Sequence, residues 1–272
     1  MSLTDKIAEI EEEIANTKYN KATQHHVGKL KAKLAQLREE VVTSSSGPKG
    51  SGYGVRKAGD ATVALVGLPS VGKSTLLNAL TDADSETGSY AFTTLDVVPG
   101  VLKYRDANIQ ILDLPGLIEG AARGAGRGKE VLSVIRSADL IVHVIDAIEP
   151  APHVILKELF DSGLRLNSRP PNGSISKTGL GGIEVISTVS QEIEEDAIKS
   201  VVREYGIVNA QVVLREKITL DDLVDILAKT RVYSPSFDVI TKVDIINKQQ
   251  LKEVRKKCTN KTIIEVAAPT GK

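Results

Sequence analysis

Apolar residues recur along the chain with two spacings, and the change from one to the other divides the sequence. In the first 42 residues the spacing is helical, with one stripe from Leu3 to Ile14 and a second from Val27 to Val41. These stripes predict an N-terminal helical hairpin that turns near residues 16–21. From Asp60 onward, short apolar runs alternate with helical segments, a pattern typical of a parallel sheet covered by helices on both faces.

The predicted fold class is therefore α/β, with a doubly wound, mostly parallel sheet. Its strands are expected at 61–66, 97–104, 107–112, 139–145, 236–241 and 262–267. Its helices are expected at 73–80, 128–137, 151–161 and 247–257. The stretch 163–235 has strand-like segments at 183–189 and 210–214 and helix-like segments at 191–205 and 220–230. It predicts an inserted small α+β domain, because structureless loops of this length are rare in compact domains.

The chain of 272 residues is long enough for one full α/β domain and small additions. The predicted organisation is an N-terminal hairpin (1–42), a flexible linker rich in Ser and Gly (43–59), the first part of the α/β domain (60–162), the inserted domain (163–235) and a second part of the α/β domain (236–272).

Composition excludes several classes of protein. Lys plus Arg and Asp plus Glu both number 35, so no net charge points to nucleic acid or membrane. The single cysteine, Cys258, excludes an internal disulfide and a cysteine-rich zinc module, and it favours a reducing, cytoplasmic location. Residues 1–20 are acidic and lack an apolar core, so neither a signal peptide nor a membrane span is expected there. His143, in an apolar strand, is expected to be a core residue, and Cys258 to be unreactive.

Charges are segregated within the predicted hairpin. Acidic residues crowd the first arm, whereas no acidic residue lies between Ile14 and Arg38, a stretch with several lysines. Two interpretations stay open: the arms neutralise each other as an antiparallel pair, or the basic arm contacts RNA phosphates or an acidic partner.

The clearest chemical signal is a glycine loop between a predicted strand and a predicted helix. Residues 67–74 have the form GxxxxGK[ST] of a phosphate-binding loop. Gly67 and Gly72 let backbone N–H groups turn toward phosphate oxygens, and the helix adds its N-terminal donors. Lys73 is expected to reach the outer phosphates and Ser74 to hold Mg²⁺. The expected binding residues are Gly67, Leu68, Pro69, Ser70, Val71, Gly72, Lys73, Ser74 and Thr75.

Two more segments are expected to sense the outer phosphate. Asp113 ends a predicted strand, where doubly wound sheets bind ligands, and can join the magnesium shell. Gly116 can bring its N–H group to a γ-phosphate, and Thr94, in preference to Thr93, can complete the magnesium shell, although strand propensity alone also explains the segment around Thr94. The nucleotide-contacting residues expected here are Phe92, Thr93, Thr94, Asp113, Leu114, Pro115 and Gly116.

The segment Thr241-Lys-Val-Asp244, after a predicted strand, favours guanine as the base. The Asp244 carboxylate can accept from both the ring N–H and the exocyclic amine of guanine, whereas adenine offers no matching pair of donors. Lys242 is expected to lay its aliphatic stem along the base and reach back to the phosphate loop. Ala267 and Ala268, after a further strand, could offer a backbone N–H group to the guanine carbonyl.

Together these motifs resemble the developmentally regulated GTP-binding protein family (Drg or Rbg), within the Obg-related translation-factor GTPases. The resemblance is carried by residues 6–10, 20–23, 29–34, 67–80, 90–95, 98–101, 113–121, 163–168, 170–171 and 241–244. It implies a P-loop GTPase fold, hydrolysis of GTP to GDP and phosphate as a molecular switch, and association with ribosomes or RNA and with a stabilising partner protein. Lys73, Thr94 and Gly116 are the expected catalytic residues, and Ser74, Thr94 and Asp113 the expected magnesium ligands.

Several departures from the family pattern carry expectations of their own. Family members continue into a closing helix and a C-terminal TGS domain, so a chain ending at Lys272 is expected to be truncated, less stable and weaker in ribosome contact. Thr241 replaces the usual Asn and can still bond the loop backbone. Leu117 cannot orient an attacking water, which predicts slow hydrolysis, and Ser70 replaces the Asn of potassium-activated relatives, which leaves K⁺ dependence open.

A second hypothesis treats the chain as an RNA- or ribosome-binding scaffold in which hydrolysis is incidental. Its support is the acid-free basic arm of the hairpin. An ATP-using kinase is disfavoured, because Asp244 has no role against adenine.

Overall fold

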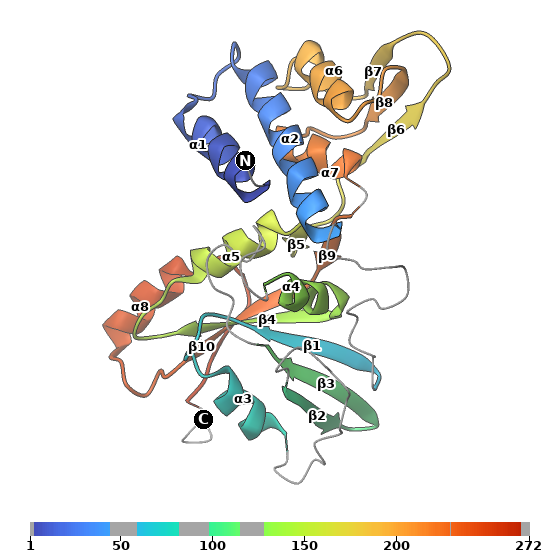
Figure 1. The fold of residues 1–272 in the computed structure, drawn as a ribbon. Coiled ribbons are helices and arrows are strands. Elements are labelled where there is room, and N and C mark those ends of the chain that lie inside the picture. Colours follow the sequence, from blue (N-terminus) through green and yellow to red (C-terminus); the bar gives the residue numbers. More distant parts are fainter. Residues whose placement is uncertain (1–2, 44–58, 82–97, 115–127, 229, 268–272) are drawn as a thin grey trace. The chain divides into compact units, whose positions relative to one another are not determined.

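The computed structural model describes residues 3–43, 59–81, 98–114, 128–228 and 230–267 (Figure 1). The chain folds into two compact units. The sheet unit comprises residues 48–168 and 232–272, and the hairpin–insertion unit comprises residues 1–47 and 169–231.

The sheet unit is built on six strands in the order β11-β10-β4-β1-β3-β2. Every neighbouring pair is parallel except β2, which runs antiparallel to β3. The carboxyl ends of the five parallel strands therefore meet at one edge of the sheet. The strands are β1 (Ala61–Val66), β2 (Val98–Tyr104), β3 (Ala107–Asp113), β4 (Leu140–Asp146), β10 (Ser236–Thr241) and β11 (Ile263–Glu265).

Helices cover both faces of this sheet, as the alternating pattern predicted (Figure 1). The helices α4 (Gly128–Ser137) and α5 (Pro152–Asp161) pack on one face around Ile135, Ile141 and Leu159. On the same face, α8 (Lys248–Lys257) packs against β4 and β10 through Val254. The opposite face carries α3 (Lys73–Leu80), whose Leu76 and Leu77 pack against the sheet.

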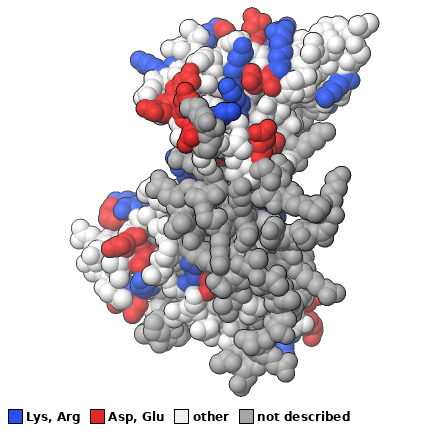
Figure 2. Space-filling model, viewed as in Figure 1, with Lys and Arg blue, Asp and Glu red and all other residues white. Residues whose placement is uncertain are grey.

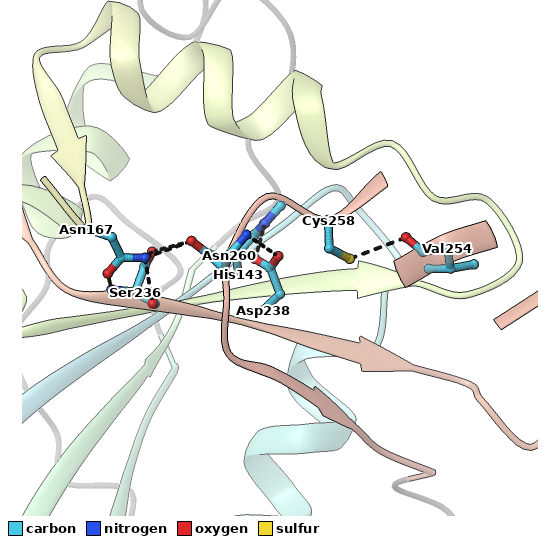
Figure 3. A network of polar contacts seen from close by, with 7 residues as sticks. All are labelled: His143, Asn167, Ser236, Asp238, Val254, Cys258 and Asn260. Atoms are coloured by element: carbon cyan, nitrogen blue, oxygen red, sulfur yellow. Dashed lines mark hydrogen bonds and ion pairs between the residues drawn. The ribbon is translucent and has the colours of Figure 1, made fainter. Parts of the chain in front are cut away.

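A buried polar network fixes β10 within the sheet (Figure 3). His143 on β4 and Asp238 on β10 are directly paired in register, and His143 Nδ1 lies 3.1 Å from Asp238 Oδ1. Both side chains are buried. Asn260 Nδ2 donates to Asp238 Oδ1 at 2.6 Å, and Asn167 Nδ2 donates to Asn260 Oδ1 at 2.7 Å. His143 is thus a core residue with a partner, as expected.

Two short strands of the sheet unit flank the insertion in the sequence. The strand β5 (Leu164–Leu166) pairs in parallel with β9 (Val232–Ser234), and both belong to the sheet unit. The sequence pattern placed these residues in the insertion and predicted neither strand. Three-residue strands are too short to show a period, and their pairing depends on contacts distant in sequence.

The hairpin–insertion unit joins the N-terminal helices to the insertion. A three-stranded sheet in the order β6-β8-β7 pairs β8 antiparallel with β6 and parallel with β7. The sequence pattern did not predict β6. The unit contains α1 (Leu3–Asn16), α2 (Gln24–Thr43), β6 (Gly173–Lys177), β7 (Ile183–Ser187), α6 (Glu195–Glu204), β8 (Ala210–Leu214) and α7 (Leu220–Leu227).

The helix α2 is buried on two sides. Leu30 and Leu34 pack against Ile7 and Ile10 of α1, which forms the expected hairpin. Val27, Ala32 and Ala35 instead join the core of the insertion, together with residues of α6, β8 and α7. Gly28 lets α2 approach closely, because a Cβ atom there would lie 2.8 Å from Cγ2 of Val201 on α6. The hairpin therefore shares a core with the insertion, whereas sequence analysis treated it as a separate domain.

Ion pairs of the basic arm reach both the first arm and the insertion. Arg38 pairs with Glu11 at 2.8 Å, in line with the interpretation in which the arms neutralise each other. His26 Nε2 lies within hydrogen-bond distance of Glu13 Oε1, at 2.9 Å. Lys31 pairs with Asp221 at 2.6 Å and Lys21 with Glu194 at 3.2 Å, so acids of the insertion compensate lysines of this arm as well. Figure 2 shows basic and acidic side chains interspersed over this unit on the face drawn.

Among the described helices, none combines the length and the apolar character that crossing a bilayer requires.

Candidate functional site

The glycine loop follows β1, the strand between β3 and β4, and its last two residues, Lys73 and Ser74, are the first two of α3. Gly67 must lack a side chain, because a Cβ atom there would lie 2.5 Å from the carbonyl oxygen of Val144 on β4. Gly72 has φ 95° and caps α3 in the left-handed region, which glycine adopts without strain. Ser70 has φ 62°, an uncommon conformation for a residue with a side chain. The loop is therefore held in a specific curved conformation.

The side chain of Lys73, the first residue of α3, contacts the backbone of the loop. Its Nζ donates to the carbonyl oxygens of Leu68 at 2.9 Å and Gly67 at 3.2 Å. The residue is 7% exposed. Burial lowers the pKa of the Lys73 ammonium, and the nearby Asp113 carboxylate opposes this by raising it. An anionic ligand at the loop would further favour the charged form of Lys73.

Ser74 and Asp113 meet at the carboxyl edge of the sheet. The Ser74 hydroxyl on α3 donates to Oδ2 of Asp113, the last residue of β3. Leu114, the next residue, is buried in the core. A hydroxyl and a carboxylate are oxygen donors of the kind that Mg²⁺ prefers. The pair that sequence analysis assigned to the ion is thus brought together.

The segment after β10 is tied to the same loop by two side chains. The Thr241 hydroxyl donates to the carbonyl oxygen of Val71 at 2.6 Å, and Lys242 Nζ donates to the carbonyl oxygen of Ser70 at 3.0 Å. Thr241 is 3% exposed. Both contacts agree with the expectation that Thr241 and Lys242 reach back to the loop.

Asp244 lies in the turn that follows, with an exposed side chain. Among the described residues none forms a hydrogen bond or ion pair with its carboxylate. Ala267 lies just after β11, where Val266 donates its backbone N–H to Ile240 at 2.8 Å. Two expected base contacts thus follow neighbouring strands, β10 and β11.

Some expected site residues fall outside the described part of the chain. They are Phe92, Thr93, Thr94, Pro115, Gly116 and Ala268. Leu117 and residues 44–58 of the linker are also outside it. Their roles remain predictions from the sequence.

The structure adds a residue that sequence analysis did not single out. Asp146 ends β4, and its Oδ2 lies 2.5 Å from Lys242 Nζ. Its Oδ1 accepts from the backbone N–H of Ile148 at 2.8 Å. The rule that drew attention to Asp113, a carboxylate at the carboxyl end of a parallel strand, applies equally to Asp146.

Comparison with known proteins gives consistent matches over most of the chain. Residues 62–171 match a family model described as 50S ribosome-binding GTPase, and residues 180–271 match the C-terminal region of that domain. An uncharacterized GTP-binding protein of Methanocaldococcus jannaschii is 52% identical over 94% of this chain and 66% of its own length. Developmentally-regulated GTP-binding protein 1 of Xenopus laevis is 48% identical over 90% of this chain and 69% of its own length. The chain belongs to the developmentally regulated GTP-binding protein family.

This Drg-family chain spans about two thirds of the length of these relatives. The P-loop GTPase fold predicted from its motifs is confirmed by the family match and by the observed sheet. Among solved structures, Era of Aquifex aeolicus bound to GDP·AlF4⁻ is similar, at 23% identity over 78% of this chain and 52% of that chain, with a TM-score of 0.40.

Proposed function

We propose that this Drg-family chain binds GTP and hydrolyses it slowly to GDP and phosphate, as a molecular switch associated with ribosomes. The observation that carries the proposal is the convergence of three groups on one loop: Lys73 beneath it, the Ser74–Asp113 pair beside it, and Thr241 with Lys242 bonded to its backbone. Backbone donors, a buried ammonium and a carboxylate for the base are the parts that a guanine nucleotide requires.

Each part has a distinct role in the proposed reaction. The loop N–H groups and Lys73 would hold the phosphates. They would stabilise negative charge while a water oxygen bonds to the γ-phosphorus and the bond from the γ-phosphorus to the bridging oxygen of the leaving GDP breaks. Ser74 and Asp113, with Thr94 in the GTP state, would hold Mg²⁺, which supplies charge neutralisation when bound. Asp244 would recognise the guanine base, to whose carbonyl Ala267 and Ala268 would offer a backbone N–H group. Gly116 would contact the γ-phosphate.

The proposed hydrolysis is slow because the residue after Gly116 is Leu117, which has no group to orient water. A partner protein, the ribosome or a monovalent cation such as K⁺ would then accelerate it. The cytoplasm is the proposed location, in agreement with the use of a single cysteine.

Single-turnover hydrolysis tests the slow rate. The expected result is a low rate for the chain with Mg²⁺ alone and a clear increase on adding ribosomes or K⁺. Replacing Lys73 by Ala should abolish nucleotide binding, while Asn78→Ala, an exposed change on the same helix, should leave it intact. Fast turnover by the isolated chain would contradict the requirement for an activator.

The ribosome association is supported by the description of the matched family model, and the scaffold hypothesis is its alternative. Cosedimentation with ribosomes in GTP, in GDP and without nucleotide separates them. A switch predicts association that depends on the nucleotide and is lost in Lys73→Ala. A scaffold predicts the same association in every condition.

A further inference from the structure

We propose that Asp146 is a positioning residue for nucleotide binding: it holds Lys242 against the phosphate loop and so fixes the loop and the base-binding turn together. The inference rests on the proposed function, because it concerns how tightly the same site retains a guanine nucleotide.

Both oxygens of the Asp146 carboxylate have defined partners. Oδ2 lies 2.5 Å from Lys242 Nζ, and Oδ1 accepts from the backbone N–H of Ile148 at 2.8 Å. The Asp146 side chain is 13% exposed and that of Lys242 is 32% exposed. At this low exposure the pair is less screened by solvent than a surface ion pair, so it can hold a lysine in one position.

Lys242 needs such support because its position is unusual. Its backbone has φ 58°, in the left-handed region that a residue with a side chain rarely adopts. Such conformations persist where surrounding contacts determine them. Lys242 also has a flexible four-carbon stem, whose freedom must be lost before it can lie along a base. The ion pair with Asp146 removes that freedom before a nucleotide arrives.

Through Lys242, Asp146 acts on the loop. Lys242 Nζ donates to the carbonyl oxygen of Ser70, at 3.0 Å, and Ser70 itself has φ 62°. Ser70 and Lys242, both with a left-handed backbone, are thus connected through the ammonium group of Lys242. Asp146, on β4, holds that ammonium group in place. Asp146 also lines a small cleft with Leu68 and Val71 of the loop. Loss of the Asp146 carboxylate would leave the Lys242 side chain unrestrained. Ser70, whose carbonyl oxygen accepts from Lys242, would then be held less firmly as well.

A double-mutant cycle on GDP release tests the proposal. Stopped-flow dissociation of a fluorescent GDP analogue is measured for the wild type, Asp146→Ala, Lys242→Ala and the double variant, with circular dichroism to verify folding. Asp146→Ala should raise the dissociation rate about tenfold and should have no further effect when Lys242 is already Ala, because the two act as one unit. Glu149→Ala removes an exposed carboxylate from the segment that follows β4 and should leave the rate unchanged.

Asp146→Asn gives a second test should the alanine variant not fold. The amide oxygen of Asn can still accept from Ile148 or Lys242 but carries no charge. The rate of GDP release should therefore rise about threefold when Asp146→Asn is the only change, and should not rise when it is added to Lys242→Ala. The proposal is overturned if either Asp146 variant releases GDP at the wild-type rate, or if its effect persists in full without Lys242. Absence of GDP binding by the wild type would instead refute the proposed function.

Discussion

The Thr241 hydroxyl donates a hydrogen bond to the carbonyl oxygen of Val71, 2.6 Å away, although the two residues are 170 positions apart in the chain. The same hydroxyl lies 3.2 Å from the carbonyl oxygen of Ile145 on β4. One buried side chain therefore connects the phosphate loop, β4 and the turn that carries Asp244. The arrangement of loop and turn depends on this residue as well as on Lys242.

Replacing Thr241 by Val should weaken the site while preserving side-chain shape. The change leaves buried carbonyl oxygens without their donor, which costs about 1–3 kcal/mol in unfolding free energy. GDP release should be several-fold faster. Thr241→Ser keeps the hydroxyl and is the matched control. Denaturant unfolding and GDP release together test this, and equal behaviour of the Val and Ser variants would show that the hydrogen bond is unimportant.

Removal of Mg²⁺ should accelerate GDP release, and this effect should depend on Ser74 and Asp113, the proposed ligands of the ion. With EDTA, we expect the wild type to release GDP at least about tenfold faster than with Mg²⁺, because the ion neutralises phosphate charge. Ser74→Ala and Asp113→Asn should reduce that ratio, while Asn78→Ala on the exposed side of α3 should not. An unchanged ratio in both site variants would remove these residues from the proposed ion shell.

Replacing Gly28 by Val should destabilise the hairpin–insertion unit. A Cβ atom at this position would lie 2.8 Å from Cγ2 of Val201 and 3.3 Å from Leu220, both buried. Overpacking of this kind costs about 2 kcal/mol. Gly179→Ala is the control, since among the described residues, its chain neighbours aside, no atom lies within 4 Å of its Cβ position. The GDP affinity of both variants should stay within about twofold of the wild-type value, because the proposed site lies in the sheet unit. A Gly28→Val variant as stable as the wild type would contradict the close packing of α2.

The Cys258 thiol should react slowly at mildly alkaline pH. Burial, together with the Asp238 carboxylate, raises the pKa of this thiol from 9.0 to about 11. At pH 8 the thiolate fraction is then about 100-fold lower than in the unfolded chain, and alkylation by iodoacetamide should slow accordingly. Because a carboxylate disfavours a nearby thiolate, Asp238→Asn should speed the reaction. Equal rates for the folded and urea-unfolded chains would refute this protection.

Local signals in the sequence were sufficient for the elements around the loop. The strands β1 and β10 and the helix α3 begin and end where expected, because a glycine or proline borders each one: Gly67 follows β1, Gly72 precedes α3 and Pro235 precedes β10. The meeting of Ser74 with Asp113 followed from the rule that carboxyl ends of parallel strands share an edge.

Features that depend on distant packing could not be predicted in this way. The second buried side of α2 consists of Val27 with small residues, Gly28, Ala32 and Ala35, which produce no apolar stripe, so its place in the insertion core was missed. The contact of Asp146 with Lys242 was missed because Asp146 belongs to none of the sequence motifs, although it ends a parallel strand as Asp113 does.

Calorimetric titration of GTP, GDP and ATP with Mg²⁺ present, on the wild type and on Asp244→Asn, tests the central claim most directly. The Asp244 carboxylate accepts from two donors that guanine has and adenine lacks, so GTP and GDP should bind at least about 100-fold more tightly than ATP. Asp244→Asn should lose guanine affinity and gain affinity for XTP, whose 2-oxo group accepts from the amide. Binding of ATP as tight as that of GTP, or binding of neither nucleotide, would contradict the account.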